Sequence, residues 1–507
     1  MKKILLLLLV VIVSQAGFAE NDTIIQRIID IGKANNQTMQ HLDVLCNRFG
    51  GRLVGSDAYD NAANWAASKF KEWGMEVELD EVGSVPVGFN RGPWFGRMMG
   101  EEAMNLHFVT PSYTSGTKGV QRGHVVAEPK TREEFNRMKG RLKGAWVLVT
   151  GKSNGFPIDF SAKADLRRDS IIAANEKTVE LNRIQKSKNP KNYTPLETSD
   201  EPALFYREMR EAGILGIVQS AAVPLVALYD RNNIMDMTFD NLPNTPDIKL
   251  DEHQFQLVER MVNERRQVFL EFDIRNFFKP GPVKYHNVIG TIRGTKFPDE
   301  YVIMGAHLDA YDAGTGGVDD GSGVTPVMEA ARLIMAAGGR PERSILVILF
   351  AAEEFGLWGS QHWVDANQDK LPRISNMFNR DSGPLAPVSL GVTEAMWNDM
   401  EAVCKPLHGI NAEFPFELKK REAMDRPAKP WGTDSGPFAV AGVPVMSFGL
   451  EDVRGHNFSY REIWHTERDT YNISIPEYQE HAAIVTAVVV YGVANLDKLL
   501  SRDGYFK

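Results

Sequence analysis

The sequence is poor in cysteine and carries no excess of positive charge. Cysteine occurs only at Cys46 and Cys404 among 507 residues, too few for a metal site built from thiolates. These two positions leave open either a disulfide or two buried thiols. Lysine and arginine number 57 against 66 aspartates and glutamates, so the formal net charge is −9. We therefore expect no nucleic-acid partner, because nucleic-acid binding requires a basic surface.

An apolar run at the N-terminus predicts export. Two lysines precede the apolar residues 4–13, and this run is too short to cross a bilayer. Gly17 and Ala19 are small residues at the −3 and −1 positions of a cleavage site. We expect a signal peptide over residues 1–19, a periplasmic or extracellular protein, and no stable membrane anchor.

Apolar strand patterns alternate with helical patterns over the C-terminal half of the chain. Residues 301–307 and 343–351 are short apolar strands, each followed by a helical segment, and a long helix is expected over residues 475–500. This alternation is typical of α/β folds, in which helices flank both faces of a mostly parallel, mixed sheet. Ligands of such sheets bind at the carboxyl ends of the strands.

The pattern changes between residues 113 and 280. Short strands and helices surround residues 154–199, a polar segment with a patch of lysine and asparagine whose charges we expect to face solvent. The change predicts a small insert domain over residues 113–280. The surrounding α/β domain would then consist of residues 20–112 and 281–507.

Five short polar groups follow apolar strands or loops of the predicted α/β domain. Each group alone is typical of a turn, a helix cap or a hydrogen-bonded core histidine. Five groups at strand ends of one sheet are better explained by a shared site, and imidazole with carboxylate is a ligand set that suits a pair of zinc-like ions. The groups contain His307 and Asp309, Asp319 and Asp320, Glu353 and Glu354, Asp381, and His465 and Asp469.

The order of these motifs resembles that of the M28 family of zinc exopeptidases. The carboxypeptidase Q branch of the family is similar in the segments HLDAYDAGTGGVDDGSG, AAEEFGLWGS, NRDSG, WGTDSGPFAVAGVP and WHTERDT. The resemblance implies a zinc-exopeptidase fold of the phosphorylase/hydrolase-like type. The segments LKGAWVLVTG and MREAGILGIVQSA resemble strands of a protease-associated domain, so the insert is expected to be β-rich.

The resemblance implies two zinc ions per chain and assigns residues to them. Asp319 would bridge the two ions, and Glu353 would be the general base. The other ligands would be His307 and Asp381 on one ion, and Glu354 and His465 on the other.

Further residues are expected to support this site or to touch the substrate. Asp309 would be the carboxylate partner of His307, and Asp469 is spaced to serve His465 in the same way. Tyr460, Trp464 and Asp434 are candidates for substrate contact. Arg380 and Arg461 are candidate partners for a substrate carboxylate.

The expected function is that of an exported di-zinc exopeptidase that acts on dipeptides or short peptides, as a carboxypeptidase or dipeptidase. An aminopeptidase of the same family is the nearest alternative, because the metal set is shared. A non-catalytic, receptor-like relative is disfavoured, because every ligand position and the base position are intact. A glutaminyl cyclase is disfavoured by the Asp-Asp-Gly-Ser-Gly run and the adjacent glutamates. Relatives also allow a homodimer.

Overall fold

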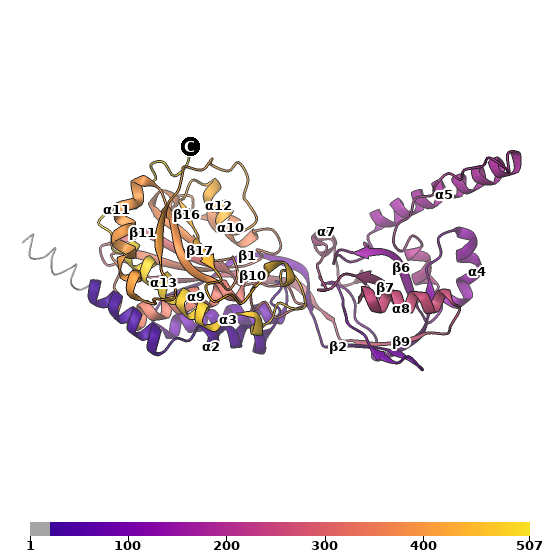
Figure 1. Ribbon diagram of the computed structural model, residues 1–507, viewed down its shortest axis with the longest axis horizontal. Coiled ribbons are helices and arrows are strands. Elements are labelled where there is room, and N and C mark those ends of the chain that lie inside the picture. Colours follow the sequence, from indigo (N-terminus) through magenta and orange to yellow (C-terminus); the bar gives the residue numbers. More distant parts are fainter. Residues whose placement is uncertain (1–20) are drawn as a thin grey trace, which may run out of the picture. The chain divides into compact units, whose positions relative to one another are not determined.

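The computed structural model describes residues 21–507, which form two compact units (Figure 1). The first unit takes in the described residues up to Ser84 together with Lys284–Trp464 and Arg468–Lys507. The second comprises Val85–Val283 and the short segment His465–Glu467. The predicted signal peptide lies outside the described residues. In the part of the chain that the structure describes, no helix has the length and apolarity that a membrane span requires.

A six-stranded mixed sheet forms the centre of the first unit. β10 runs antiparallel to β12, whereas β11 pairs in parallel with β12 and β13, and β13 pairs in parallel with β16. This arrangement confirms the expected mixed α/β sheet. In spatial order the strands are β1 (Glu76–Asn90), β10 (Phe277–Ile292), β12 (Arg343–Phe350), β11 (Phe297–His307), β13 (Ile374–Asn379) and β16 (Val445–Met446).

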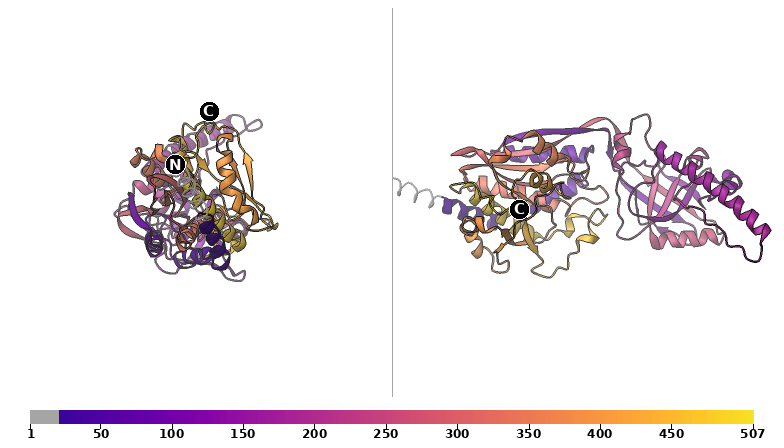
Figure 2. Two further views of the ribbon diagram at one scale, coloured as in Figure 1. Left: turned by 90° about the vertical axis from the view of Figure 1, so that its left-hand side faces the viewer. Right: turned by 90° about the horizontal axis from the view of Figure 1, so that it is seen from above.

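Helices flank this sheet (Figures 1 and 2). Alternate residues of β11 and β12, such as Ile303 and Ile348, form one apolar cluster with Trp363 of α10 (Trp358–Ala366) and Phe438 of α12 (Ser435–Val440). The helices α9 (Gly321–Ala336) and α13 (Pro476–Ala494) pack on each other and on β11. Other helices of the unit are residues 21–34, α2 (Thr38–Asp43), the π-helix Val44–Phe49, α3 (Asp57–Glu72) and α11 (Trp397–Cys404).

The helix predicted over residues 475–500 is shorter in the structure. α13 ends at Ala494, because the side-chain amide of Asn495 donates to the Tyr491 carbonyl at 2.7 Å and caps the last turn. A smaller sheet of the same unit has the order β15 (Glu417–Lys420), β14 (Ala386–Val392), β17 (Phe448–Glu451). Cys46 and Cys404 are both free and buried, so they form no disulfide.

The second unit is built on an eight-stranded sheet and contains the predicted insert, residues 113–280, together with the strands before it. Its core packs Trp146 against Phe272 at a ring distance of 4.8 Å. α5 (Ala162–Lys188) exposes most of its polar side chains and extends beyond the sheet of its own unit (Figure 1). The strands, in order, are β3 (Met104–Asn105), β2 (Trp94–Met99), β9 (Phe269–Ile274), β5 (Gln121–Ala127), β6 (Ala145–Ser153), β7 (Gly216–Ala221), β8 (Asp247–Asp251) and β4 (Phe108–Val109), with helices α4 (Arg132–Leu142), α6 (Tyr206–Glu211), α7 (Arg231–Met235) and α8 (Glu252–Asn263).

Candidate metal centre

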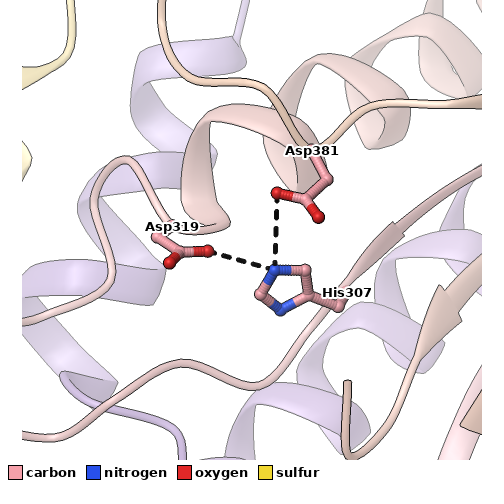
Figure 3. Close-up of side chains that lie close together, drawn as sticks. All are labelled: His307, Asp319 and Asp381. Carbon is pink, nitrogen blue, oxygen red and sulfur yellow. Dashed lines mark ion pairs between the residues drawn. The ribbon is translucent and has the colours of Figure 1, made fainter. Parts of the chain in front are cut away.

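Three predicted metal ligands converge at the carboxyl ends of neighbouring strands of the first unit (Figure 3). His307 is the last residue of β11, and Asp381 follows the parallel strand β13 by two residues. Asp319 lies in the loop just before α9. His307 Nε2 lies 3.1 Å from Asp319 Oδ1 and 3.8 Å from Asp381 Oδ1. Three donor atoms so close together can all reach one cation.

Asp319 also approaches a second predicted ligand. One donor atom of Glu354 lies within 4.8 Å of a donor atom of Asp319. Glu353 and Glu354 begin a tight turn two residues after the end of β12, and Ala352 just before them takes a positive φ of 56°. Asp319 therefore lies near both groups of candidate ligands, where a bridging carboxylate would have to be.

His465 belongs to the short segment His465–Glu467 of the second unit. Within that unit its carbonyl accepts a hydrogen bond from the Ala227 N–H at 3.4 Å, and Thr466 bridges to Val226. The role of His465 as a metal ligand stays a prediction.

His307 is held by its neighbours in the orientation that metal binding needs. Its Nδ1 lies 3.0 Å from the Asp309 carbonyl oxygen and 3.6 Å from Asp309 Oδ1. A proton on Nδ1 leaves the Nε2 lone pair directed at Asp319 and Asp381. Burial lowers the pKa of His307, but the carboxylates of Asp309, Asp319 and Asp381 outweigh it and raise that pKa well above its ordinary value.

Asp309 also fixes the turn that carries the two glutamates. Its Oδ1 accepts the backbone N–H of Glu353 at 3.1 Å, and its Oδ2 accepts that of Glu354 at 3.2 Å. Asp309 is completely buried, so these bonds are shielded from water. The predicted partner of His307 therefore supports three site residues at once.

Asp469, which its spacing predicts as the partner of His465, holds the loop that presents Asp319. Its Oδ1 accepts the Val318 N–H at 2.6 Å, and its Oδ2 accepts the Asp319 N–H at 3.1 Å. Burial, together with the charge of Asp319, raises the pKa of Asp469 to about 7.

Several buried carboxyl groups lie close together in the centre, and their ionised forms repel one another unless a cation is bound. Burial, followed by the neighbouring carboxylates, raises the pKa of Glu353 and of Glu354. Asp320 is completely buried and its pKa is raised by the same two causes, burial and the charges of Asp381 and Asp319. A divalent cation among such groups restores their ionised state. The donor set, imidazole nitrogen with carboxylate oxygens, is one that zinc accepts.

The candidates for substrate contact differ in where they lie. The ring of Tyr460 lies 3.4 Å from the position of a Cβ on Gly383, close to Asp381, and burial and the site carboxylates raise its pKa. Trp464 is about half exposed, at 52%. Asp434 is buried at the start of α12, and burial raises its pKa to about 7.

The two arginines predicted to hold a substrate carboxylate are not placed alike. Arg380 is buried, and its Nε donates to the Ser322 carbonyl at 3.1 Å. The role of Arg380 as a partner of a substrate carboxylate stays a prediction. Arg461 is exposed in a 3-10 turn.

Asp320 and Gly323 are site residues whose roles the sequence did not reveal. Asp320 Oδ2 accepts the His307 N–H at 3.2 Å, which ties the loop before α9 to the end of β11. A Cβ on Gly323 would lie 2.0 Å from the Arg380 carbonyl oxygen and 2.3 Å from Asp320 Oδ1. In the sequence, only the Asp-Asp-Gly-Ser-Gly run indicated that these two residues belong to the site.

Comparisons with known proteins agree with this geometry. Residues 287–489 match the model of Peptidase family M28, and this region contains all five predicted ligands and Glu353. Carboxypeptidase Q of Mus musculus is 24% identical over 482 residues, which cover 93% of this chain and 88% of that protein.

Two solved structures share the fold. A peptidase M28 precursor from Shewanella amazonensis SB2B has a TM-score of 0.57 at 20% identity, covering 95% of this chain and 98% of that one. BSAP, a zinc aminopeptidase from Bacillus subtilis, has a TM-score of 0.50 at 16% identity, covering 93% and 97%. At such identities these two likenesses concern the fold alone.

Proposed function

Because the chain is a metallopeptidase of family M28, similar to carboxypeptidase Q, we propose that it is a di-zinc exopeptidase acting on dipeptides or short peptides. The observation that carries the proposal is the convergence of His307, Asp319 and Asp381 at the ends of parallel strands. Buried carboxylates are costly unless they are paired or bind a metal, and a metal centre would account for this group.

The ligands divide between two zinc ions. His307 and Asp381 would hold one ion and Glu354 and His465 the other, with Asp319 shared by both. The closeness of Asp319 to both His307 and Glu354 supports this sharing. Bound zinc supplies Lewis acidity and lowers the pKa of water at the site.

Glu353 is proposed as the general base. Its turn is fixed by Asp309, so its carboxylate can take a proton from the attacking water and return it to the leaving amine. Tyr460 is proposed to donate to the oxyanion that forms when water adds to the scissile carbonyl, and its closeness to Gly383 and the influence of Asp381 on its pKa support this.

Carboxypeptidase or dipeptidase activity is the first choice, because the similarity to carboxypeptidase Q spans 93% of the chain. We further propose that the protein is exported after cleavage of residues 1–19, and that the second unit is an insert of the protease-associated type. The resemblance of the segments LKGAWVLVTG and MREAGILGIVQSA supports the last assignment.

The test combines metal analysis with a panel of blocked peptides. We expect two zinc ions per chain, hydrolysis of Ala-Ala by a carboxypeptidase or a dipeptidase, hydrolysis of N-acetyl-Ala-Ala as well by a carboxypeptidase, and loss of these activities in the presence of a chelator. Hydrolysis of Ala-Ala-amide but not of N-acetyl-Ala-Ala would identify an aminopeptidase instead. A chain that binds no zinc and cleaves no peptide would contradict the enzyme assignment.

A further inference from the structure

A pocket of the first unit adjoins the candidate metal centre, and metal binding does not account for its chemistry. Its volume is about 370 Å³, and its lining includes the predicted ligand Asp381 as well as Arg421, Trp431, Thr433 and Ser447. This volume lies near the lower end of the range for ligand pockets, which suits one amino-acid residue better than a long peptide.

Arg421 is the one cationic side chain in the lining of this pocket. It is half-buried, and no carboxylate of residues 21–507 forms an ion pair with it. Its side-chain contacts are with a hydroxyl, a ring and a carbonyl. Nη1 donates to Tyr505 Oη at 3.0 Å, Cζ lies 4.3 Å from the centre of the Tyr505 ring, and Nε donates to the Glu422 carbonyl at 3.4 Å. Within the described part of the chain, the positive charge is thus not paired with a carboxylate.

The guanidinium group is held in place before any ligand binds. The Tyr505 hydroxyl accepts the Val445 N–H at 3.0 Å and also donates to the Val445 carbonyl, which ties it to the edge strand β16. The Arg421 N–H donates to the Val392 carbonyl at 2.9 Å, and the Arg421 stem passes 3.8 Å from the position of a Cβ on Gly391. Holding the cation in advance lowers the entropy lost on binding.

Asn379 belongs to the same lining. Its Nδ2 donates to Thr433 Oγ1 at 2.8 Å, while its Oδ1 is buried and has no partner in the described chain. An unsatisfied buried oxygen is costly, so Asn379 adds polarity to the wall of the pocket. The pocket therefore offers one cation that no carboxylate of the described residues pairs with, beside the predicted metal ligand Asp381.

From these contacts we infer that Arg421 binds a carboxylate of the substrate in the pocket that adjoins Asp381, and so selects peptides that place a carboxylate there. The inference rests on the proposed exopeptidase function. A planar guanidinium suits this role, because it can donate two parallel hydrogen bonds to one carboxylate. The carboxylate can come from an acidic side chain or from the free C-terminus of the peptide.

The experiment measures kcat and KM of the zinc-loaded enzyme and of Arg421→Gln. Ala-Glu is compared with Ala-Gln, Glu-Ala with Gln-Ala, and Ala-Ala with Ala-Ala-amide. We expect the wild-type protein to prefer the carboxylate in one of these pairs by about 10- to 100-fold in kcat/KM, through KM. Arg421→Gln should remove that preference alone. The first two pairs report a side-chain carboxylate, and the third reports the C-terminus.

Arg426→Gln is the matched control, because it removes the same charge from the same loop. Arg426 is exposed, donates to the Val440 carbonyl and does not line the pocket. Arg421→Lys keeps the charge with less disturbance of Tyr505, and it should retain part of the preference. The inference is overturned if Arg421→Gln lowers kcat/KM equally for every peptide, or changes none.

A wild-type enzyme that cleaves no peptide of the panel would refute the proposed function but not this inference. Calorimetric titration with free glutamate, free glutamine and glutamine α-amide then distinguishes the outcomes. Binding that is tighter for glutamate than for glutamine, or tighter for glutamine than for its α-amide, and that loses this difference in Arg421→Gln, supports the carboxylate pocket. Equal binding of all three, or binding of none, overturns it.

Discussion

Asp309 holds Glu353 through the backbone, because its Oδ1 accepts the Glu353 N–H at 3.1 Å. The other oxygen of the same carboxylate accepts the Glu354 N–H. A single buried side chain thus fixes the backbone at the start of two adjacent side chains. Two glutamates that begin at fixed, neighbouring positions can serve different purposes, one as base and the other as ligand.

Replacement of each glutamate separately tests this division of roles. Glu353→Gln should lower kcat by about 10²- to 10⁴-fold, the usual contribution of a general base, and should keep its zinc. Glu354→Gln should lose zinc from one site, because an amide oxygen is a weaker ligand than a carboxylate. Enzyme assays and elemental analysis of the same samples provide the comparison, with Glu401→Gln on the exposed side of α11 as control. Equal zinc content in both inactive variants would refute the division.

The support that Asp309 provides can be tested by Asp309→Asn. An amide has one acceptor oxygen, so one of the two backbone N–H groups loses its partner and the His307 ring loses a carboxylate neighbour. We expect zinc affinity or kcat/KM to fall by about 10- to 100-fold. Zinc titration against a competing chelator measures the zinc affinity, and enzyme assays measure kcat/KM. Asp365→Asn, on the exposed side of α10, should change neither.

The convergence of His307 and Asp381 could be predicted, because each follows a strand pattern and parallel strands end at one edge of the sheet. The contact of Asp469 with the N–H of Asp319 could not, because those residues lie 150 positions apart. Spacing alone favoured His465 as the partner of Asp469, because His465 is much nearer to Asp469 in sequence. Arg421 was missed for a related reason: its environment is formed by Tyr505, far along the chain, and no motif surrounds it.

Gly323 should tolerate no larger residue. A Cβ there would lie 2.0 Å from the Arg380 carbonyl oxygen and 2.3 Å from Asp320, and neither the backbone nor a buried carboxylate can move cheaply. We expect Gly323→Ala to lower the free energy of unfolding by roughly 2–4 kcal/mol and to weaken zinc binding, since Asp320 supports the His307 loop.

Gly140→Ala is the control for Gly323→Ala. Gly140 lies within α4, and a Cβ there meets no atom within 4 Å. Alanine should stabilise that helix by up to about 1 kcal/mol. Denaturant titrations of both variants give the comparison, and a Gly323→Ala protein as stable as the wild type would show that the loop before α9 can rearrange.

His481 should make the stability of the first unit depend on pH. The ring is buried on α13 with the Phe414 ring 4.9 Å away, and burial lowers its pKa from 6.5 to about 4, with Arg380 and Lys33 adding to the shift. Between pH 6.5 and pH 4 this histidine is protonated in the unfolded chain but neutral in the folded chain. The free energy of unfolding therefore falls as the pH is lowered from about 6.5 to 4, by up to about 3 kcal/mol from this group.

The contribution of His481 is isolated by comparing how steeply the stability of each protein changes with pH, rather than by comparing the stabilities themselves. His481→Asn removes the titrating ring, so its denaturation midpoint should fall less steeply between pH 6.5 and pH 4 than that of the wild type. Both proteins are measured with chelator present, so that release of metal in acid does not contribute to the difference. His408→Asn, at an exposed position, should keep the wild-type slope. Parallel curves for His481→Asn and wild type would show that this histidine takes up its proton equally in both states.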